Sequence, residues 1–230
     1  KKLFGDINMF KLFFHTIYCK TNNALCLFLN LFQDQKCYGC DKKEKLSKYG
    51  FCQNCEKEII FYQNSDTLFY HVAAYEGPIK NAIHKFKYGK KKFYGKKLAL
   101  FVYDNLKEKI PEFDLIIPVP LHWKKEFSRT FNQSAIISVY LGKLFGKDVL
   151  IDGVVKTKNT PSQVELIGSE REKNVLNTFK VRKTSSIKDK KILLVDDVFT
   201  TGATTNELKK ILKKAGAKNV IVITIAKTIL

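Results

Sequence analysis

The sequence Ile192-Leu-Leu-Val-Asp-Asp-Val-Phe-Thr-Thr-Gly-Ala-Thr-Thr205 joins an apolar run to two adjacent carboxylates and a threonine-rich turn with one glycine. Beyond this turn, apolar residues recur at helical spacing, at Leu208, Ile211, Leu212 and Ala215. The order of buried strand, polar loop and amphipathic helix predicts a unit of a parallel α/β sheet. Ligands of such sheets bind at the carboxyl ends of the strands, where this loop would lie.

The chemistry of the turn predicts a phosphate site. Backbone N–H groups of residues 200–204 would face an anion at the positive end of the helix. Gly202 allows a positive φ and a close approach of the ligand. Asp196 and Asp197 are placed to accept hydrogen bonds from sugar hydroxyls or to face a Mg²⁺ ion. A helix N-cap would need only one such polar residue, so the turn favours a sugar 5′-phosphate as ligand.

The segment closely resembles the 5-phosphoribosyl-1-pyrophosphate (PRPP) signature of type I phosphoribosyltransferases. The resemblance implies that Asp196 and Asp197, the candidate catalytic pair, hold the 2′- and 3′-hydroxyls of the ribose. It also implies that the 5′-phosphate is cradled by Thr200, Thr201, Gly202, Ala203 and Thr204. The expected fold is therefore a type I phosphoribosyltransferase-like parallel sheet with flanking helices.

The composition is that of a folded, strongly basic protein. The 230 residues suffice for one core and a small appendage, and a hydrophobic content of 45% argues against disorder. The net charge of +19 favours encounters with nucleic acid, phosphorylated small molecules or an anionic membrane surface. Charge alone does not choose among these partners.

Residues 1–35 have the pattern of an amphipathic helical segment, with its apolar positions at Phe10, Phe14, Ile17, Leu25, Phe28 and Phe32. Charged residues such as Lys11 and Lys20 interrupt the segment, which disfavours a signal peptide. No stretch approaches the roughly 18 apolar residues of a membrane span. We therefore expect no stable membrane insertion and a cytoplasmic location, with surface binding to a membrane as the weaker alternative.

Two Cys-x-x-Cys pairs, Cys37 with Cys40 and Cys52 with Cys55, are separated by eleven residues. Four thiolates at this spacing predict a tetrahedral Zn²⁺ site. Two disulfides or a redox pair are the alternatives, which the reducing cytosol disfavours. Such a zinc ion would be structural, because four protein ligands leave no open position for catalysis.

The chain divides by pattern into a helical segment (1–35), a zinc module (36–60) and an α/β domain (61–230). Within that domain we expect strands at 68–75, 114–119, 149–155, 177–181 and 219–225, besides the one that opens at 192. Helices are expected from Pro78, over 94–110, over 129–145 and after the phosphate turn. This alternation predicts a parallel sheet.

The predicted strand at 114–119 ends in a second polar loop. Two prolines, Pro118 and Pro120, stop its ladder. The loop beyond contains Lys124, Lys125 and Arg129, cations that suit a multiply charged anion such as pyrophosphate. An ordinary basic surface loop is the alternative, and the residues alone do not decide between the two.

Several ordered motifs resemble the ComF family of competence-associated proteins, over residues 37–230. They are Pro-Val-Pro-Leu at 118–121, Arg-Thr-Phe-Asn-Gln at 129–133, Lys-Phe-Lys-Tyr-Gly at 85–89, the segment 156–163, Arg171 with Asn174, and a four-cysteine module. The resemblance implies a pyrophosphate loop of Pro118, Val119, Pro120, Lys124 and Arg129, and a hood over the acceptor of Gln163, Arg171 and Asn174. Thr130 and Lys156 depart from the family's usual glycine and arginine; Lys156 replaces a bidentate anion clamp by a point charge.

The resemblance implies a PRPP-binding, phosphoribosyltransferase-type protein that acts with Mg²⁺ in natural transformation, with an acceptor that the sequence does not identify. The alternative is a non-catalytic protein that handles single-stranded DNA beside the DNA-uptake machinery. In that reading, lysines at 85–92 and 124–125 would contact phosphates, and Tyr38, Tyr49 or Phe51 would stack on bases. Packing around the zinc knuckles explains these aromatic residues equally simply.

Overall fold

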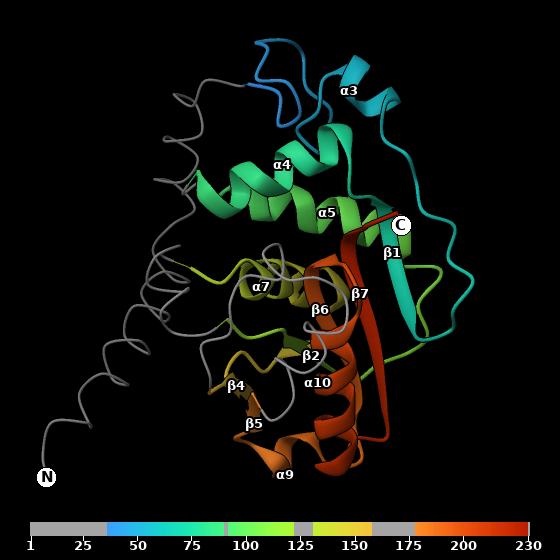
Figure 1. The fold of residues 1–230 in the computed structure, drawn as a ribbon, viewed down its shortest axis with the longest axis vertical. Helices are drawn as coiled ribbons and strands as arrows, with labels where there is room; N and C mark the ends of the chain where they lie inside the picture. Colours follow the sequence, from blue (N-terminus) through green and yellow to red (C-terminus); the bar gives the residue numbers. More distant parts are fainter. Residues whose placement is uncertain (1–35, 90–91, 122–130, 158–177, 230) are drawn as a thin grey trace, which may run out of the picture. The chain divides into compact units, whose positions relative to one another are not determined.

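The computed structural model describes residues 36–89, 92–121, 131–157 and 178–229. These residues belong to one compact unit, Lys36–Leu230, built on a five-stranded sheet (Figure 1). The predicted helical segment 1–35 lies outside the described residues, and the predicted boundary at 60/61 stays a prediction. No helix within the described ranges is long and apolar enough to cross a membrane.

The sheet has the strand order β1-β7-β6-β2-β3. In this order its strands are Phe69–Ala74, Asn219–Lys227, Lys191–Phe199, Leu115–Pro118 and Asp148–Val149. Every neighbouring pair is parallel, which confirms the predicted parallel sheet. Strand β6, which carries the acidic pair, lies between β7 and β2, and its carboxyl end is therefore at the middle of the sheet edge.

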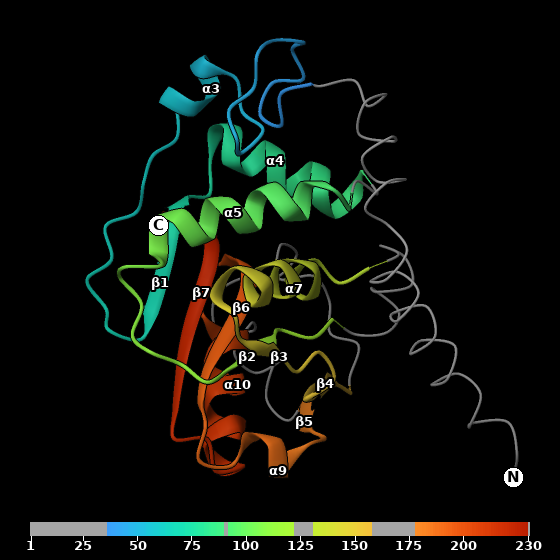
Figure 2. The same ribbon diagram turned by 180° about the vertical axis from the view of Figure 1, so that it is seen from behind.

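Helices cover both faces of the sheet. Both faces of β6 are therefore buried, which explains why its sequence contains an uninterrupted apolar run. Leu193 and Val195 pack in one core cluster with residues of α4 (Gly77–Tyr88), α5 (Tyr94–Leu106) and α7 (Gln133–Phe145). Ile192 and Leu194 pack in a second cluster with α10 (Ala203–Lys214). Figure 1 shows α10 in front of the sheet, and Figure 2 shows α7 on the opposite side.

One predicted strand is wrong. Residues 149–155 do not form a single strand, because the chain turns at 151–153, where the N–H of Gly153 donates to the carbonyl of Leu150. Asp148–Val149 ends the main sheet as β3, whereas β4 (Val154–Lys156) pairs antiparallel with β5 (Phe179–Val181). A short apolar run does not reveal such a turn, since strands on both sides of it have the same composition.

The remaining elements differ from prediction mainly at their ends. Helix α5 stops at Leu106 rather than Ile110, and β7 runs on to Lys227. Two short helices, α3 (Gln53–Lys57) and α9 (Thr184–Ile187), were not predicted. Pro78 lies in the first turn of α4, as expected.

Residues 60–66 run along the free edge of β1. The N–H of Tyr62 donates to the carbonyl of Val72, and the N–H of Ala74 donates to the carbonyl of Ile60. An isolated antiparallel bridge joins Phe61 to Ala73. This edge segment thus shields the outermost strand from pairing with another chain.

Candidate functional site

The two aspartates lie near the carboxyl end of the central strand. Strand β6 continues past them to Phe199, so that Asp196 pairs with Thr224 of β7 within the ladder. The rigid strand fixes the backbone of both acids. The structure therefore places the acidic pair where the parallel sheet offers its ligand edge.

Helix α7 supplies a hydroxyl to Asp196. The Oγ of Ser134 donates to Asp196 Oδ1 at 3.0 Å, and the N–H of Asp197 donates to the same oxygen at 2.9 Å. Asn132 caps α7 by accepting from the N–H of Ala135, and its amide donates to the carbonyl of Val119 at 3.0 Å. The N-terminal end of α7 is thus hydrogen-bonded both to the acidic pair and to the Pro-Val-Pro segment.

The described part of the predicted pyrophosphate loop lies next to the acidic strand. Pro118 ends β2, and the N–H of Val119 donates to the carbonyl of Val195, the residue before the acidic pair. Pro120 follows, partly exposed. The basic members of the loop, Lys124 and Arg129, lie outside the described residues, as do the three predicted hood residues Gln163, Arg171 and Asn174.

The predicted phosphate turn leads directly into α10, which begins at Ala203. Gly202 has a φ of 78°, and a Cβ there would lie 2.6 Å from the Phe199 ring, so no other residue fits without strain. A cavity of about 10 Å³ brings Asp196 together with Thr200, Gly202 and Thr204. Thr201 and Ala203 lie in the same turn. The predicted phosphate-binding residues are therefore neighbours of Asp196 at the helix start.

Sequence reasoning missed Lys87 of α4 as a member of this site. Its ammonium lies 2.9 Å from Asp197 Oδ1, with the two side chains 16% and 12% exposed. Burial by itself would lower the pKa of Lys87, but the charges of Asp197 and Asp196 raise it above its usual value. A signal was present: Lys87 continues the buried stripe of Ile79 and Ile83 on α4, where an apolar residue is expected.

Asp196 is the member of the acidic pair whose ionisation the protein disfavours. Burial, and after it the charge of Asp197, raise the pKa of Asp196 to about 7, although Lys87 and the hydroxyl of Ser134 oppose the shift. Two adjacent carboxylates with a single close cation cannot both ionise without cost. The site is thus arranged for a ligand that adds hydrogen-bond donors or positive charge.

The raised pKa of Asp196 predicts a pH-dependent gain of stability in Asp196→Asn. In the unfolded chain this carboxyl ionises near pH 4, but in the folded protein only near pH 7. Wild type therefore loses stability between these pH values, and Asn does not. We expect the variant to be more stable by at least about 1–2 kcal/mol at about pH 8 and nearly equal near pH 4. Urea unfolding at both pH values checks this; a variant less stable at the higher pH would contradict it.

The four predicted metal ligands converge in a second site. The Sγ atoms of Cys37, Cys40, Cys52 and Cys55 all lie within 4.8 Å of one another, and the thiols are not joined in disulfides. The 3.8 Å between Cys40 and Cys52 Sγ equals the edge of about 3.8 Å that Zn–S bonds of about 2.3 Å give in a tetrahedron. The donor set thus fits a zinc ion.

The local backbone supports this cluster. Burial disfavours the thiolate of Cys37, but hydrogen bonds from surrounding backbone N–H groups lower its pKa to about 7. One of these comes from Cys52, at 3.2 Å. A Cβ at Gly39 would lie 2.8 Å from Cys55 Sγ and 2.8 Å from Pro78 Cβ. Glycine thus lets the knuckle close against both the cluster and the start of α4.

Helix α4 joins the cysteine cluster to the acidic pair. Lys85 donates to the carbonyl of Tyr38 at 3.1 Å and pairs with Asp41 at 2.7 Å. Asn81 donates to the carbonyl of Gly39 at 3.0 Å. Two residues beyond Lys85, Lys87 reaches the acidic pair. Lys87 is thus engaged by the largely buried acidic pair, whereas Lys85 pairs with the exposed Asp41; the predicted contact of lysines at 85–92 with DNA stays a prediction.

The aromatic residues of the cysteine module pack inside the protein. Tyr38 is 5% exposed and stacks on Tyr94 with ring centroids 3.6 Å apart, and Phe51 is buried. Tyr49 donates to Asp104 at 3.1 Å and packs edge-on against Phe101. Of the two interpretations of these rings, packing is correct. Stacking of Tyr38 or Phe51 on nucleic acid bases is excluded by their burial.

Known proteins resemble this chain over most of its length. The phosphoribosyl transferase domain family matches residues 129–228. Competence protein F of Haemophilus influenzae is 28% identical over 225 residues, 90% of this chain and 94% of that protein. Competence protein ComFC of Streptococcus pneumoniae is 30% identical over 190 residues, 81% of this chain and 78% of its own length. DNA utilization protein YhgH of Escherichia coli is 28% identical over 165 residues, 69% and 71% of the two chains. Together with the parallel sheet, these matches confirm the predicted phosphoribosyltransferase-like fold.

Proposed function

Because the chain belongs to the ComF family of competence-associated proteins, we propose that it binds PRPP and acts in the uptake or use of DNA. One observation carries the proposal: Asp196, the first residue of the acidic pair of β6, and the glycine turn at the start of α10 share one cavity at the carboxyl edge of the sheet. An anion at the helix start and a sugar next to the carboxylates would both be satisfied there. Natural transformation, in the cytoplasm, is the process we propose, and the names of the relatives, competence and DNA utilization proteins, support the link to DNA.

Each part of the site has a proposed role toward PRPP. Residues 200–204 hold the 5′-phosphate through their N–H and hydroxyl groups, and Asp196 and Asp197 accept hydrogen bonds from the ribose hydroxyls. The pyrophosphate is assigned to the loop that begins at Pro118, with the basic residues Lys124 and Arg129. The acceptor side is assigned to Gln163, Arg171 and Asn174.

The proposed reaction is displacement of pyrophosphate from C1 of PRPP by a nucleophilic acceptor. The carboxylates and the phosphate turn would hold the ribose, so that the reacting carbon is fixed relative to the pyrophosphate loop. Lys87, whose ammonium lies 2.9 Å from Asp197 Oδ1, would offset the negative charge of the acidic pair beside the ribose. Mg²⁺, bound with the pyrophosphate, would offset the charge of the leaving group. The oxygens of Asp196 and Asp197 suit this ion, although Lys87 already neutralises one of them.

We further propose that the four cysteines bind a structural zinc ion. The sulphur geometry fits tetrahedral coordination. The cysteines are buried in the same core cluster as residues of α4 and α5, apart from the exposed Cys40. The ion would thereby brace the helix that delivers Lys87.

A non-catalytic role in handling single-stranded DNA is the second candidate function. The net charge of +19 and the names of the relatives, competence and DNA utilization proteins, favour it. Exposed lysines would provide phosphate contacts and hence salt-dependent affinity. Proteins of the DNA-uptake machinery are the partners we propose in that case.

Calorimetric titration of PRPP with Mg²⁺ tests the first function. We expect wild type to bind, and the Asp196→Asn/Asp197→Asn double variant to bind about a hundredfold more weakly, since about 3 kcal/mol is lost with charged hydrogen-bond acceptors. Asp148→Asn, an exposed change at the edge strand, is the matched control and should bind as wild type does. An acceptor screen for pyrophosphate release follows. Absence of binding to wild type would leave the DNA-handling function.

A further inference from the structure

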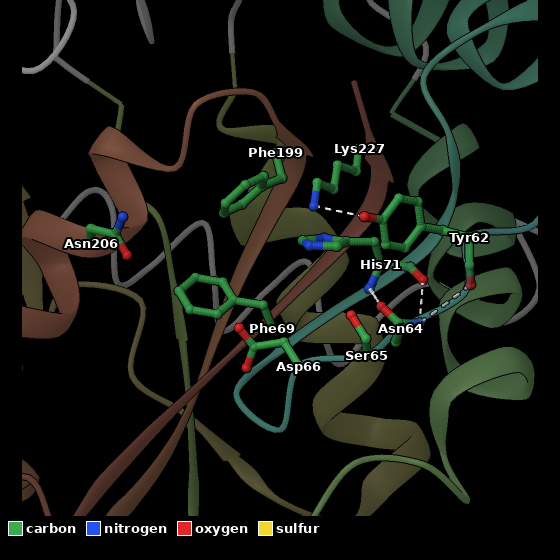
Figure 3. A pocket seen from close by; sticks show the side chains of 9 residues that line it. All are labelled: Tyr62, Asn64, Ser65, Asp66, Phe69, His71, Phe199, Asn206 and Lys227. Atoms are coloured by element: carbon green, nitrogen blue, oxygen red, sulfur yellow. Dashed lines mark hydrogen bonds between the residues drawn. The ribbon is translucent and has the colours of Figure 1, made fainter. Parts of the chain in front are cut away.

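A second cavity, of about 180 Å³, lies between the edge segment 60–66, strand β1 and the first turn of α10 (Figure 3). Phe199 separates it from the phosphate turn, because its ring packs against Gly202 and also lines the cavity, 4.8 Å from the ring of His71. The walls of the cavity come from the edge segment, β1, the ends of β6 and β7, and the first turn of α10. The proposed PRPP site does not use it.

His71 lines this cavity with a largely buried ring, and the hydrogen-bonding character of both ring nitrogens is defined. Its Nδ1 lies 2.8 Å from the Oγ1 of Thr224. That hydroxyl donates its own hydrogen bond to the carbonyl of Ala226, at 3.0 Å. Nδ1 must therefore carry the proton, which leaves Nε2 as an acceptor. Among the described residues none donates to Nε2. Burial, and then the charge of Lys227, lower the pKa of His71 to about 4, so the ring is neutral near pH 7.

Lys227 presents donors beside this acceptor. Its ammonium donates to the hydroxyl of Tyr62 at 2.7 Å and lies 5.5 Å from the centre of the Phe199 ring. Figure 3 shows the amine next to the imidazole of His71, with the ring of Phe199 on the other side. An ammonium has three donors, and the bond to Tyr62 uses one of them. The cavity thus offers a neutral acceptor and a charged donor side by side.

Aromatic rings make up the apolar part of the cavity. Phe69 and Phe199 meet edge to face at 5.5 Å, and Phe199 is tilted by 47° to His71. Lys209 lies 4.0 Å above the ring of Phe69, a residue that lines the cavity, and adds positive charge there. Aromatic surfaces with a few polar groups and nearby cations are the features by which proteins hold an unpaired base and its phosphate.

We propose that this cavity binds one unpaired nucleobase of the kind that presents a ring N–H next to a carbonyl oxygen, as thymine and guanine do. The N–H would donate to His71 Nε2, and the carbonyl would accept from Lys227, while the base lies against Phe69 and Phe199. Adenine and cytosine present an acceptor where the N–H is needed, and so would place two acceptors in contact. The proposal does not rest on PRPP binding at the acidic pair.

Fluorescence anisotropy with short labelled oligothymidylate and oligocytidylate tests the proposal. We expect wild type to prefer oligothymidylate by about fivefold or more, the discrimination that a pair of hydrogen bonds to a base edge provides. Lys227→Met should reduce this preference, because the carbonyl of the base loses its donor. Lys214→Met removes the same charge from the exposed far end of α10 and should weaken both oligonucleotides equally, with the preference kept.

Two further measurements separate this proposal from its alternatives. The Asp196→Asn/Asp197→Asn variant should keep the preference, so that a failure of the PRPP site does not disturb this test. Competition with thymidine monophosphate separates the sources of the base: full competition indicates a site for free nucleotides, and weak competition indicates that the strand itself is bound. Equal affinity of wild type for the two oligonucleotides, or an unchanged preference in folded Lys227→Met, would overturn the proposal.

Discussion

Removal of zinc is expected to lower the melting temperature of the protein by about 10 °C or more, since structural zinc sites contribute several kcal/mol to folding. The cysteines are part of the main core: Cys37, Cys52 and Cys55 are buried with Phe86 and Phe101 in one cluster. Loss of the ion would leave buried thiolates to repel one another or to take up protons. The destabilisation would therefore extend to α4 and α5, against which the cysteine-containing segment packs.

The measurement is thermal unfolding by circular dichroism, with metal content by mass spectrometry. Chelator-treated wild type should melt early and recover on addition of zinc, whereas Cys55→Ser should melt early and not recover. Cys26→Ser, a change at a cysteine that is not one of the four predicted ligands, is the control and should retain stoichiometric zinc. Protein that is isolated without zinc, or with the four thiols in disulfides, would contradict the prediction.

Loss of the Lys87 charge is expected to have the second largest effect. In Lys87→Met, Asp197 would stay largely buried beside Asp196 without its counter-ion at 2.9 Å. Removing one partner of a buried ion pair costs about 3–5 kcal/mol, and the partial exposure of this pair brings our expectation to about 2–4 kcal/mol. That corresponds to a melting temperature lower by roughly 5–15 °C.

The pH dependence identifies the cause of this loss. Without Lys87 the pKa of Asp196 must rise further in the folded state, because the charge of Lys87 opposes that rise in wild type, while its unfolded value stays near 4. The cost is thus present in full above the raised pKa and shrinks as the pH falls toward about 4. Urea unfolding of Lys87→Met, Asp197→Asn and the double variant over this range measures it. The two changes together should cost less than the sum of their separate costs.

An exposed ion pair provides the control for Lys87. Lys183 lies 2.9 Å from Asp152, with side chains 48% and 55% exposed. Lys183→Met removes the same charge, and we expect a loss of less than about 1 kcal/mol. Equal effects of the two lysine changes would show that Lys87 has no special relation to the acidic pair.

The sequence predicted those parts of the site that are contiguous in the chain. The run from Ile192 to Thr205 determines strand, turn and helix within fourteen residues, and its apolar character is that of a strand buried on both faces. The two cysteine pairs likewise predicted that the four thiols meet in one site, because closely spaced cysteines bring their ligand atoms together whatever the rest of the fold. Where the pattern was short and uniform, at 149–155, the turn that divides β3 from β4 went unpredicted.

The tertiary structure alone decided which distant residues meet. Lys87 and Ser134 reach the acidic pair from α4 and α7, and Tyr38 lies under Tyr94 rather than at the surface. His71 and Thr224, far apart in the chain, form a hydrogen bond across adjacent strands. A periodic pattern tells which side of an element is buried but not what it is buried against. Hydrophobic packing fixes those partners, and with them the charge balance of the acidic pair and the shape of the second cavity.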